Sequence, residues 1–123
     1  MILITGAAGK TGTAITKQLT ASNHEIRCLI FRENQKESLM DIGVNEFVIG
    51  DMRNKKVVKK ALCGIKAVYH ICPNVNPDEL QIGILIIEEA LSARVEHFVY
   101  HSVLLPQISA MPHHWNKLLV EEF

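Results

Sequence analysis

The sequence predicts a doubly wound α/β fold, in which helices cover both faces of a parallel sheet. Short apolar runs alternate with segments of helical periodicity along the whole chain, and the first apolar run leads directly into a glycine-rich turn. The composition agrees, because 48% hydrophobic and 21% charged residues in a chain of 123 are sufficient for one core. We therefore expect a single domain over residues 1–123.

Ten elements are expected in strict alternation. The strands are 2–5, 26–31, 46–49, 67–71 and 98–102, and the helices are 10–21, 35–42, 55–62, 78–93 and 112–123. Gly43 and Gly64 end the second and third helices, and Pro112 opens the last one, where its missing N–H costs nothing. A doubly wound sheet of this kind would have the strand order 3-2-1-4-5, with a ligand expected between the carboxyl ends of strands 1 and 4.

The chain ends within the last expected helix, before any sixth strand. We therefore expect a truncated product or one part of a longer protein, with strand 5 at an unpaired edge. The helix over 78–93 carries apolar residues beyond one narrow stripe, so it needs a second cover. That cover is either the absent C-terminal part or a second copy in a homodimer.

Charge and hydropathy exclude several classes of partner. Lys and Arg number 13 and Asp and Glu number 13, and this balance argues against nucleic acid and anionic membranes. The longest apolar run, 82–87, is far shorter than the roughly 20 residues of a membrane span. With no secretion signal and three cysteines that form no Cys-x-x-Cys pair, we expect a cytoplasmic protein with reduced thiols.

The strongest motif is the glycine-rich turn over 5–12, which follows a strand and precedes a helix. Gly6 allows a tight turn, Gly9 lets the backbone approach a pyrophosphate, and Gly12 permits close packing of the helix on the strand. The helix N-terminus adds positive potential for an anion. The turn therefore predicts a dinucleotide site that also includes Ala8, Lys10 and Thr11, the alternative being a purely structural turn.

This motif, in its context, resembles the NmrA-like branch of the atypical short-chain dehydrogenase/reductases. The resemblance covers the whole chain and corresponds to the N-terminal, Rossmann-type half of those proteins, which binds NAD(P). Asp51, after strand 3 and beside Met52, resembles the family's adenine-contacting acidic position. Cys72 and Pro73 resemble the loop that runs under the nicotinamide ribose.

The family's catalytic Ser and Lys match Ser102 and Lys117. The resemblance implies that Ser102 polarises a substrate carbonyl and that Lys117 orients the ribose. The family's usual Tyr lies four residues before the Lys, where this chain has His113. Histidine is a competent general acid near neutral pH, so His113 is the predicted proton donor. In the alternative, His113 and Lys117 are surface residues and Ser102 only caps its strand.

NADP is favoured over NAD as the cofactor. An NAD site has an acidic residue at the end of strand 2, and the corresponding residue here is Ile30, which accepts no hydrogen bond. Arg32 follows, where a guanidinium can pair with a 2′-phosphate, and Lys10 can add a second charge. NAD remains an alternative cofactor, because Glu33 could reach a ribose hydroxyl.

Three functions remain in consideration. The first is an NADP(H)-dependent oxidoreductase that moves a hydride between the nicotinamide and a small carbonyl or quinone. The second is a non-catalytic sensor that binds NAD(P), and the third is an inactive fragment. No metal is expected, since His101, His113 and His114 have no recognised zinc spacing. Cys72 is expected to be a small buried hydrophobe, and Tyr69 and Tyr100 to be sheet residues.

Overall fold

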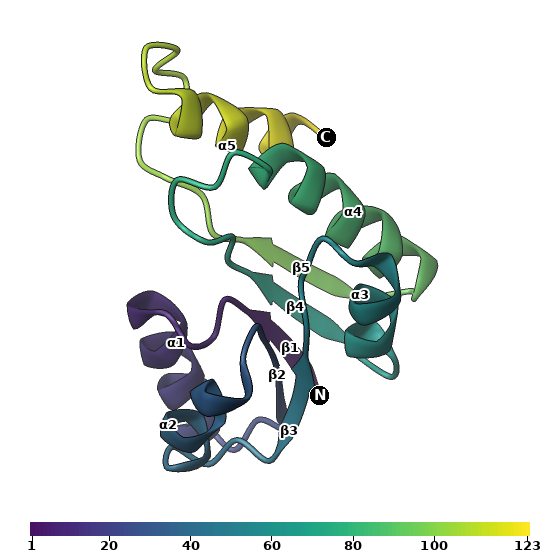
Figure 1. The fold of residues 1–123 in the computed structure, drawn as a ribbon. Coiled ribbons are helices and arrows are strands. Elements are labelled where there is room, and N and C mark those ends of the chain that lie inside the picture. Colours follow the sequence, from purple (N-terminus) through teal and green to yellow (C-terminus); the bar gives the residue numbers. More distant parts are fainter.

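The computed structural model describes residues 1–123 as a sheet with helices on both faces (Figure 1). The strands are β1 (Ile2–Thr5), β2 (Ile26–Ile30), β3 (Glu46–Ile49), β4 (Ala67–His70) and β5 (His97–Tyr100). All neighbouring strands are parallel, and their order across the sheet is β3-β2-β1-β4-β5. The predicted fold class and strand order are confirmed.

The helices follow the strands in the expected alternation. They are α1 (Lys10–Ala21), α2 (Lys36–Met40), α3 (Lys55–Leu62), α4 (Glu79–Ser92) and α5 (Pro112–Glu122), and a short 3-10 helix, η1 (Glu33–Gln35), precedes α2. Helices α1 and α2 lie on one face of the sheet, and α3 and α4 lie on the other (Figure 1). Helix α5 packs on α4.

Side-chain alternation along the strands divides the interior into two cores. Leu3, Leu29 and Val68 point toward α3 and α4, where they join Ile82 and Ile86. Their neighbours on the other face of the sheet, which include Ile4 and Cys28, pack under α1 and α2. Because both faces of the central strands are buried, these strands read as continuous apolar runs in the sequence.

The second helix differs from the expected range 35–42. The turn begins with η1, because the Gln35 Oε1 accepts the backbone N–H of Phe31 at 2.9 Å and of Arg32 at 2.8 Å. Gly43, with φ +95°, ends the helical segment soon after Met40. This fixes the backbone around Arg32, immediately after β2.

Strand β5 also differs, since it was expected over 98–102 and ends at Tyr100. One further bond, from the His101 N–H to the His70 carbonyl at 2.8 Å, continues the pairing. Strand β4 also ends at His70, and no further backbone hydrogen bond joins the two segments beyond this one. Ser102 therefore lies in the loop after the strand and not within it. The remaining elements begin and end within one residue of their expected bounds.

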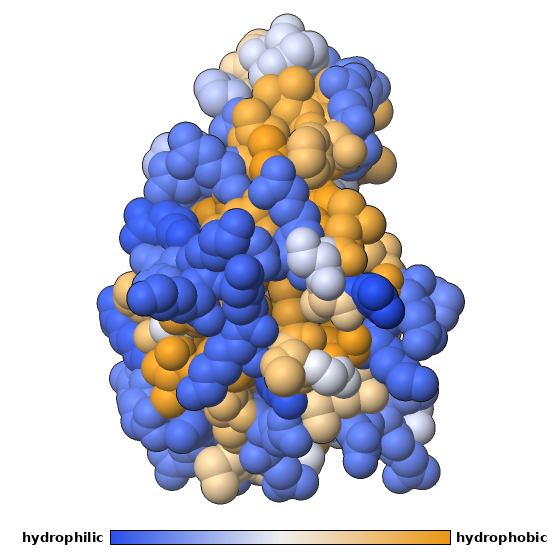
Figure 2. Space-filling model, turned by 90° about the vertical axis from the view of Figure 1, so that its right-hand side faces the viewer, coloured by the Kyte–Doolittle hydropathy of each residue, from blue (hydrophilic) through white to orange (hydrophobic).

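A hydrophobic groove of about 410 Å³ runs between α4, β5 and α5. Leu91 and Phe123 on its walls are 72% and 58% exposed. Figure 2, which faces this side of the molecule, shows hydrophobic side chains gathered in a band through its middle. Helix α4 thus has the second apolar side that its sequence indicated. None of the helices combines the length and hydrophobicity needed to cross a membrane.

Candidate functional site

The glycine-rich turn brings β1, α1 and the end of β4 into close contact. Gly6 has φ +62°, in the left-handed region, and a Cβ there would lie 2.6 Å from the Ile71 carbonyl oxygen. A Cβ on Gly12 would collide with the Gly6 carbonyl and lie 2.7 Å from the Ala7 Cα. Larger residues at either position would push α1 away from the sheet, so the motif is needed for this packing.

A cavity of about 450 Å³ opens at the carboxyl edge of the sheet, beside this turn. We call it the switch-point cavity because it lies where the connections diverge, between β1 and β4. Its walls come from the turn, from the loops after β4 and β5, and from α5. They are formed by Gly6, Gly9, Lys10, Thr11, Gly12, Ile71, Cys72, Pro73, Asn74, His101, Ser102, Val103 and Lys117.

The start of α1 gives one end of this cavity a positive potential. The backbone N–H groups of Lys10, Thr11 and Gly12 have no acceptor within the chain, and no acidic residue occupies the first turn. Unpaired N–H groups at a helix start attract anions. The exposed Lys10 ammonium adds a full charge and has no carboxylate partner. This end of the cavity is suited to a phosphate group.

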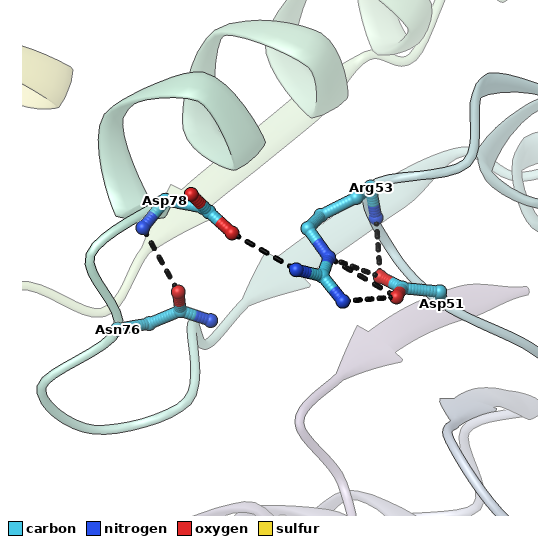
Figure 3. A network of polar contacts seen from close by, with 4 residues as sticks. All are labelled: Asp51, Arg53, Asn76 and Asp78. Atoms are coloured by element: carbon cyan, nitrogen blue, oxygen red, sulfur yellow. Dashed lines mark hydrogen bonds and ion pairs between the residues drawn. The ribbon is translucent and has the colours of Figure 1, made fainter.

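A second cavity of about 250 Å³ lies at the ends of β2 and β3, and Pro73 lines both cavities. Its walls are Leu29, Ile30, Phe31, Gly50, Asp51, Met52, Arg53, Pro73, Asn76 and Ile82. Asp51 and Met52 are both part of this wall. Figure 3 shows that the Asp51 carboxylate is held by Arg53, whose Nη2 is 2.7 Å from Oδ2.

Arg53 also joins two loops across this second cavity. Its Nη1 donates to the Asp78 Oδ2 at 3.0 Å, and the Asp78 N–H donates to the Asn76 Oδ1 at 2.9 Å (Figure 3). The hydrogen bonds from Arg53 hold the pKa of Asp51 below its usual range. Asp51 is therefore an ionised acceptor at neutral pH, although its oxygens are already engaged.

Arg32 lies exposed just beyond β2, with its guanidinium 5.8 Å from the centre of the Phe31 ring. It forms no ion pair, whereas Glu33 beside it pairs with Lys36 at 2.6 Å. Arg32 is consequently free to bind an added anion. Glu33, which could accept a hydrogen bond from a ribose hydroxyl of NAD, is already paired with Lys36.

Lys117 is buried in the wall of the switch-point cavity and does not lie on the surface. Its ammonium donates to the Glu79 Oε1 and, at 3.3 Å, to the His101 carbonyl. Glu79 is fully buried at the start of α4, and the Tyr100 hydroxyl donates to the same Oε1 at 2.8 Å. Burial and this bond raise the pKa of Tyr100. We call Glu79, Tyr100 and Lys117 the buried triad.

His70 lies fully buried next to the triad, with its ring 5.6 Å from that of Tyr100. The Thr5 Oγ1 is 2.7 Å from its Nδ1. Burial, and after it the nearby Lys117 charge, lowers the pKa of His70 to about 3, so the ring is neutral. The His70 Nε2 and the Glu79 Oε2 are enclosed and have no partner in the chain.

The predicted catalytic residues are not all brought together. Ser102 and Lys117 line the switch-point cavity, but the Ser102 hydroxyl donates to a Glu121 carboxylate oxygen. His113 does not line it, and its ring packs edge-on against His114 with the centroids 4.5 Å apart. His101, which sequence reasoning considered only as a metal ligand, lies in the cavity wall beside Ser102.

Cys72 contributes a buried side chain to the cavity wall. Burial, and after it the Glu79 charge, raises the pKa of its thiol to about 12, which disfavours a reactive thiolate. The side chain therefore acts as a small hydrophobe, as its sequence context indicated. Histidine, cysteine and carboxylate side chains form no group of three that could hold a metal ion.

Comparison with known proteins identifies the family of this chain. The sequence model of the NmrA-like family matches residues 1–123. An NAD(P)H azoreductase of Xenophilus azovorans is 30% identical over 99 residues, which cover 80% of this chain and 34% of that protein. The chain thus spans about a third of the length of this relative.

Two solved structures share the fold. The triphenylmethane reductase of Citrobacter sp. matches with a TM-score of 0.85 and 23% identity, over 98% of this chain and 43% of that one. The NADPH-dependent quinone oxidoreductase QOR2 of Escherichia coli, solved in complex with NADPH, matches with a TM-score of 0.84 and 21% identity. That match covers 99% of this chain and 44% of the other.

Proposed function

The chain belongs to the NmrA-like family, and from this premise we propose that residues 1–123 form the NADP(H)-binding domain of an oxidoreductase. The observation that carries the proposal is the pair of cavities that meet at Pro73 along the carboxyl edge of the sheet. One cavity has unpaired helix N–H groups suited to a pyrophosphate, and the other is lined by Asp51 and by Phe31, the residue before the exposed Arg32. A dinucleotide is the ligand whose chemistry fits this pair.

In this arrangement, Gly6, Ala8, Gly9, Lys10, Thr11 and Gly12 surround the pyrophosphate. Asp51 and Met52 face the adenine half, and Cys72, Pro73 and Lys117 face the nicotinamide half. The unpaired Arg32 supports NADP over NAD, because a planar guanidinium pairs well with a 2′-phosphate. NAD is the alternative, and the Glu33–Lys36 pair counts against it.

The bound dinucleotide would supply a hydride, and the chain would orient the reacting groups. We propose a small carbonyl or quinone as the acceptor. The names of the azoreductase and of the quinone oxidoreductase support a reductase of this class. Ser102, once released from Glu121, is the candidate to polarise the acceptor oxygen, and Lys117 is held beside it by Glu79.

Calorimetric titration of the chain with NADPH and NADH tests the cofactor proposal. The expected result is tighter binding of NADPH, which Arg32→Ala weakens by about 10-fold or more, because a charge-assisted hydrogen bond contributes about 1.5–3 kcal/mol. NADH binding should stay unchanged in the variant. Lys66→Ala removes one positive charge before β4, at the opposite edge of the sheet, and serves as the control. Binding of neither nucleotide contradicts the proposal.

A second candidate function is a non-catalytic NAD(P)-binding regulator. The observation that favours it is that Ser102 and Lys117, the family's catalytic pair, are both engaged by carboxylates. Following NADPH oxidation with a panel of quinones and aldehydes separates the two. Oxidation that depends on the acceptor supports the enzyme, and NADPH binding without oxidation by any acceptor supports the regulator.

The homodimer also remains a proposal. The hydrophobic groove between α4, β5 and α5 is the surface on which a second copy would pack. Sedimentation of the chain, with Leu91→Glu as the variant, tests it. A dimer that the variant dissociates is the expected result, and a wild-type monomer contradicts it.

A further inference from the structure

The reaction proposed above needs a proton as well as a hydride, and the switch-point cavity contains few groups that could supply it. The titratable side chains in its wall are Lys10, Cys72, His101 and Lys117. Burial keeps the Cys72 thiol protonated. The Lys117 ammonium already donates hydrogen bonds to Glu79 and to the His101 carbonyl. Lys10 lies at the phosphate end. His101 is the remaining candidate at the other end.

Tyr69 fixes the orientation of the His101 ring. The Tyr69 hydroxyl is 3.1 Å from the His101 Nδ1, and the two rings lie with their centroids 6.0 Å apart. The register explains this contact, because Tyr69 pairs with Val99 and the residue two further along β5 points to the same face. The Lys117 ammonium holds the His101 carbonyl from α5. His101 is therefore held from two sides.

This hydrogen bond engages Nδ1 and leaves Nε2 as the nitrogen that can give a proton to a ligand. In the charged ring, Nδ1–H donates to the Tyr69 oxygen and Nε2 carries the second hydrogen. The Nε2 makes no hydrogen bond within the chain and is not among the enclosed unpartnered atoms. It is thus a free N–H donor on a ring that lines the cavity.

We propose that His101 is the proton donor of the reaction and that Tyr69 is its positioning residue. For a carbonyl acceptor, the bound dinucleotide would supply a hydride to the carbonyl carbon, and the acceptor oxygen would take the proton from Nε2 of the His101 imidazolium. The C=O double bond becomes a C–H and an O–H bond, and the neutral imidazole keeps its remaining proton on Nδ1, facing Tyr69. Water then returns a proton to the ring. This inference rests on the proposed oxidoreductase function and replaces His113 in the role of acid.

Kinetics of matched variants test the proposal. His101→Gln keeps an N–H donor but cannot release a proton, so kcat should fall about 100-fold or more while NADPH binding and KM change less than about 3-fold. His97→Asn, an exposed histidine at the start of β5, is the control.

A second measurement is independent of turnover. Long-range ¹H–¹⁵N spectra of the chain report which imidazole nitrogen carries the proton. We expect the neutral His101 ring to carry it on Nδ1, where it donates to the Tyr69 oxygen, and Tyr69→Phe to shift the population toward Nε2–H and to lower kcat about 10-fold. A neutral ring protonated on Nε2 in the wild type overturns the proposal.

The two levels of failure are distinguishable. Absence of NADPH binding, or of oxidation by any acceptor in the wild type, overturns the proposed function and this inference with it. Full activity in His101→Gln overturns this inference alone. Loss of kcat in His113→Gln, with His101→Gln active, returns the acid role to His113.

Discussion

The carboxyl edge of the sheet is built in two different ways on its two sides. On the side of α1 and β2 the polar groups are open: helix N–H groups have no acceptor, and Lys10 and Arg32 have no carboxylate partner. On the side of β5 and α5 the charged groups are buried and already paired, as in the triad of Glu79, Tyr100 and Lys117. An open cationic surface suits a mobile anion, whereas a buried ion pair fixes side chains in one geometry.

The two sides also differ in what maintains them. The open side depends on backbone geometry, since Gly6 and Gly12 let the turn approach β4 and α1. The closed side depends on compensated charges in a region of low dielectric constant, where one unpaired group is costly. Substitutions should therefore affect mainly ligand binding on the first side and mainly folding stability on the second.

Glu79→Ala should give the largest effect on stability. It leaves the buried Lys117 ammonium and the Tyr100 hydroxyl without their acceptor, and breaking a buried pair costs about 3–5 kcal/mol. Urea unfolding measures the loss. The double variant Glu79→Leu with Lys117→Met should recover much of it, because no charge then stays unpaired. A loss below about 1 kcal/mol in Glu79→Ala would show that the triad is not a stabilising unit.

Gly12→Ala should lower the stability by an intermediate amount, and it tests whether the open side mainly affects ligand binding. The new methyl group collides with the Gly6 carbonyl, and overpacking of this kind costs about 1–3 kcal/mol. Because α1 must shift, NADPH binding should fall more than stability does. Circular dichroism melting and calorimetry on the same sample measure both. Gly64→Ala is a control for loss of a glycine away from the site, because a Cβ there has no neighbour within 4 Å, although its φ of +72° adds some strain.

The last stability prediction concerns pH and His70. The folded state holds the His70 pKa at about 3, below its ordinary 6.5, so the unfolded chain binds more protons between these values. The free energy of unfolding should therefore fall by up to roughly 1.4 kcal/mol for each pH unit below 6.5. Urea midpoints from pH 7 to pH 5 measure the slope.

His70→Gln should flatten that slope, because it removes the titrating ring from the core. The exposed His24 gives a matched control, His24→Gln, which should keep the wild-type slope. Equal slopes in all three proteins would mean that carboxylates alone set the acid sensitivity.

Much of the open side could be predicted from local sequence. The glycine spacing in the turn has a direct geometric meaning, and the alternation of apolar runs with helical segments predicts a parallel, doubly wound sheet. Arg32 follows β2 closely, so its place at the edge needs no tertiary information. The pairing of Asp51 with Arg53 also involves Asp78 from a distant loop, so the Asp51 environment could not be read locally.

The contacts on the closed side could be predicted only with knowledge of the register between neighbouring strands. Tyr69 meets His101 only because β4 and β5 pair at Tyr69 and Val99, and no local pattern gives that register. Ser102 lies beyond β5, whose pairing with β4 ends at Tyr100 and His70. Glu79 did leave a signal: it shares a helical face with Ile82, Gly83 and Ile86, all of which are buried. An acidic residue on the buried, apolar face of a helix indicates that a cation or a hydrogen-bond donor is buried beside it.

The most direct test of the account is a ¹H–¹⁵N correlation titration of the chain with NADPH. The largest amide shifts should occur at Lys10, Thr11 and Gly12 and around Arg32. Smaller shifts should occur at His101 and Ser102. Amides at the opposite edge, such as Lys66 and His97, should not move. Shifts confined to that edge or to the groove between α4 and α5, or no shifts at all, would contradict a dinucleotide site at the carboxyl edge of the sheet.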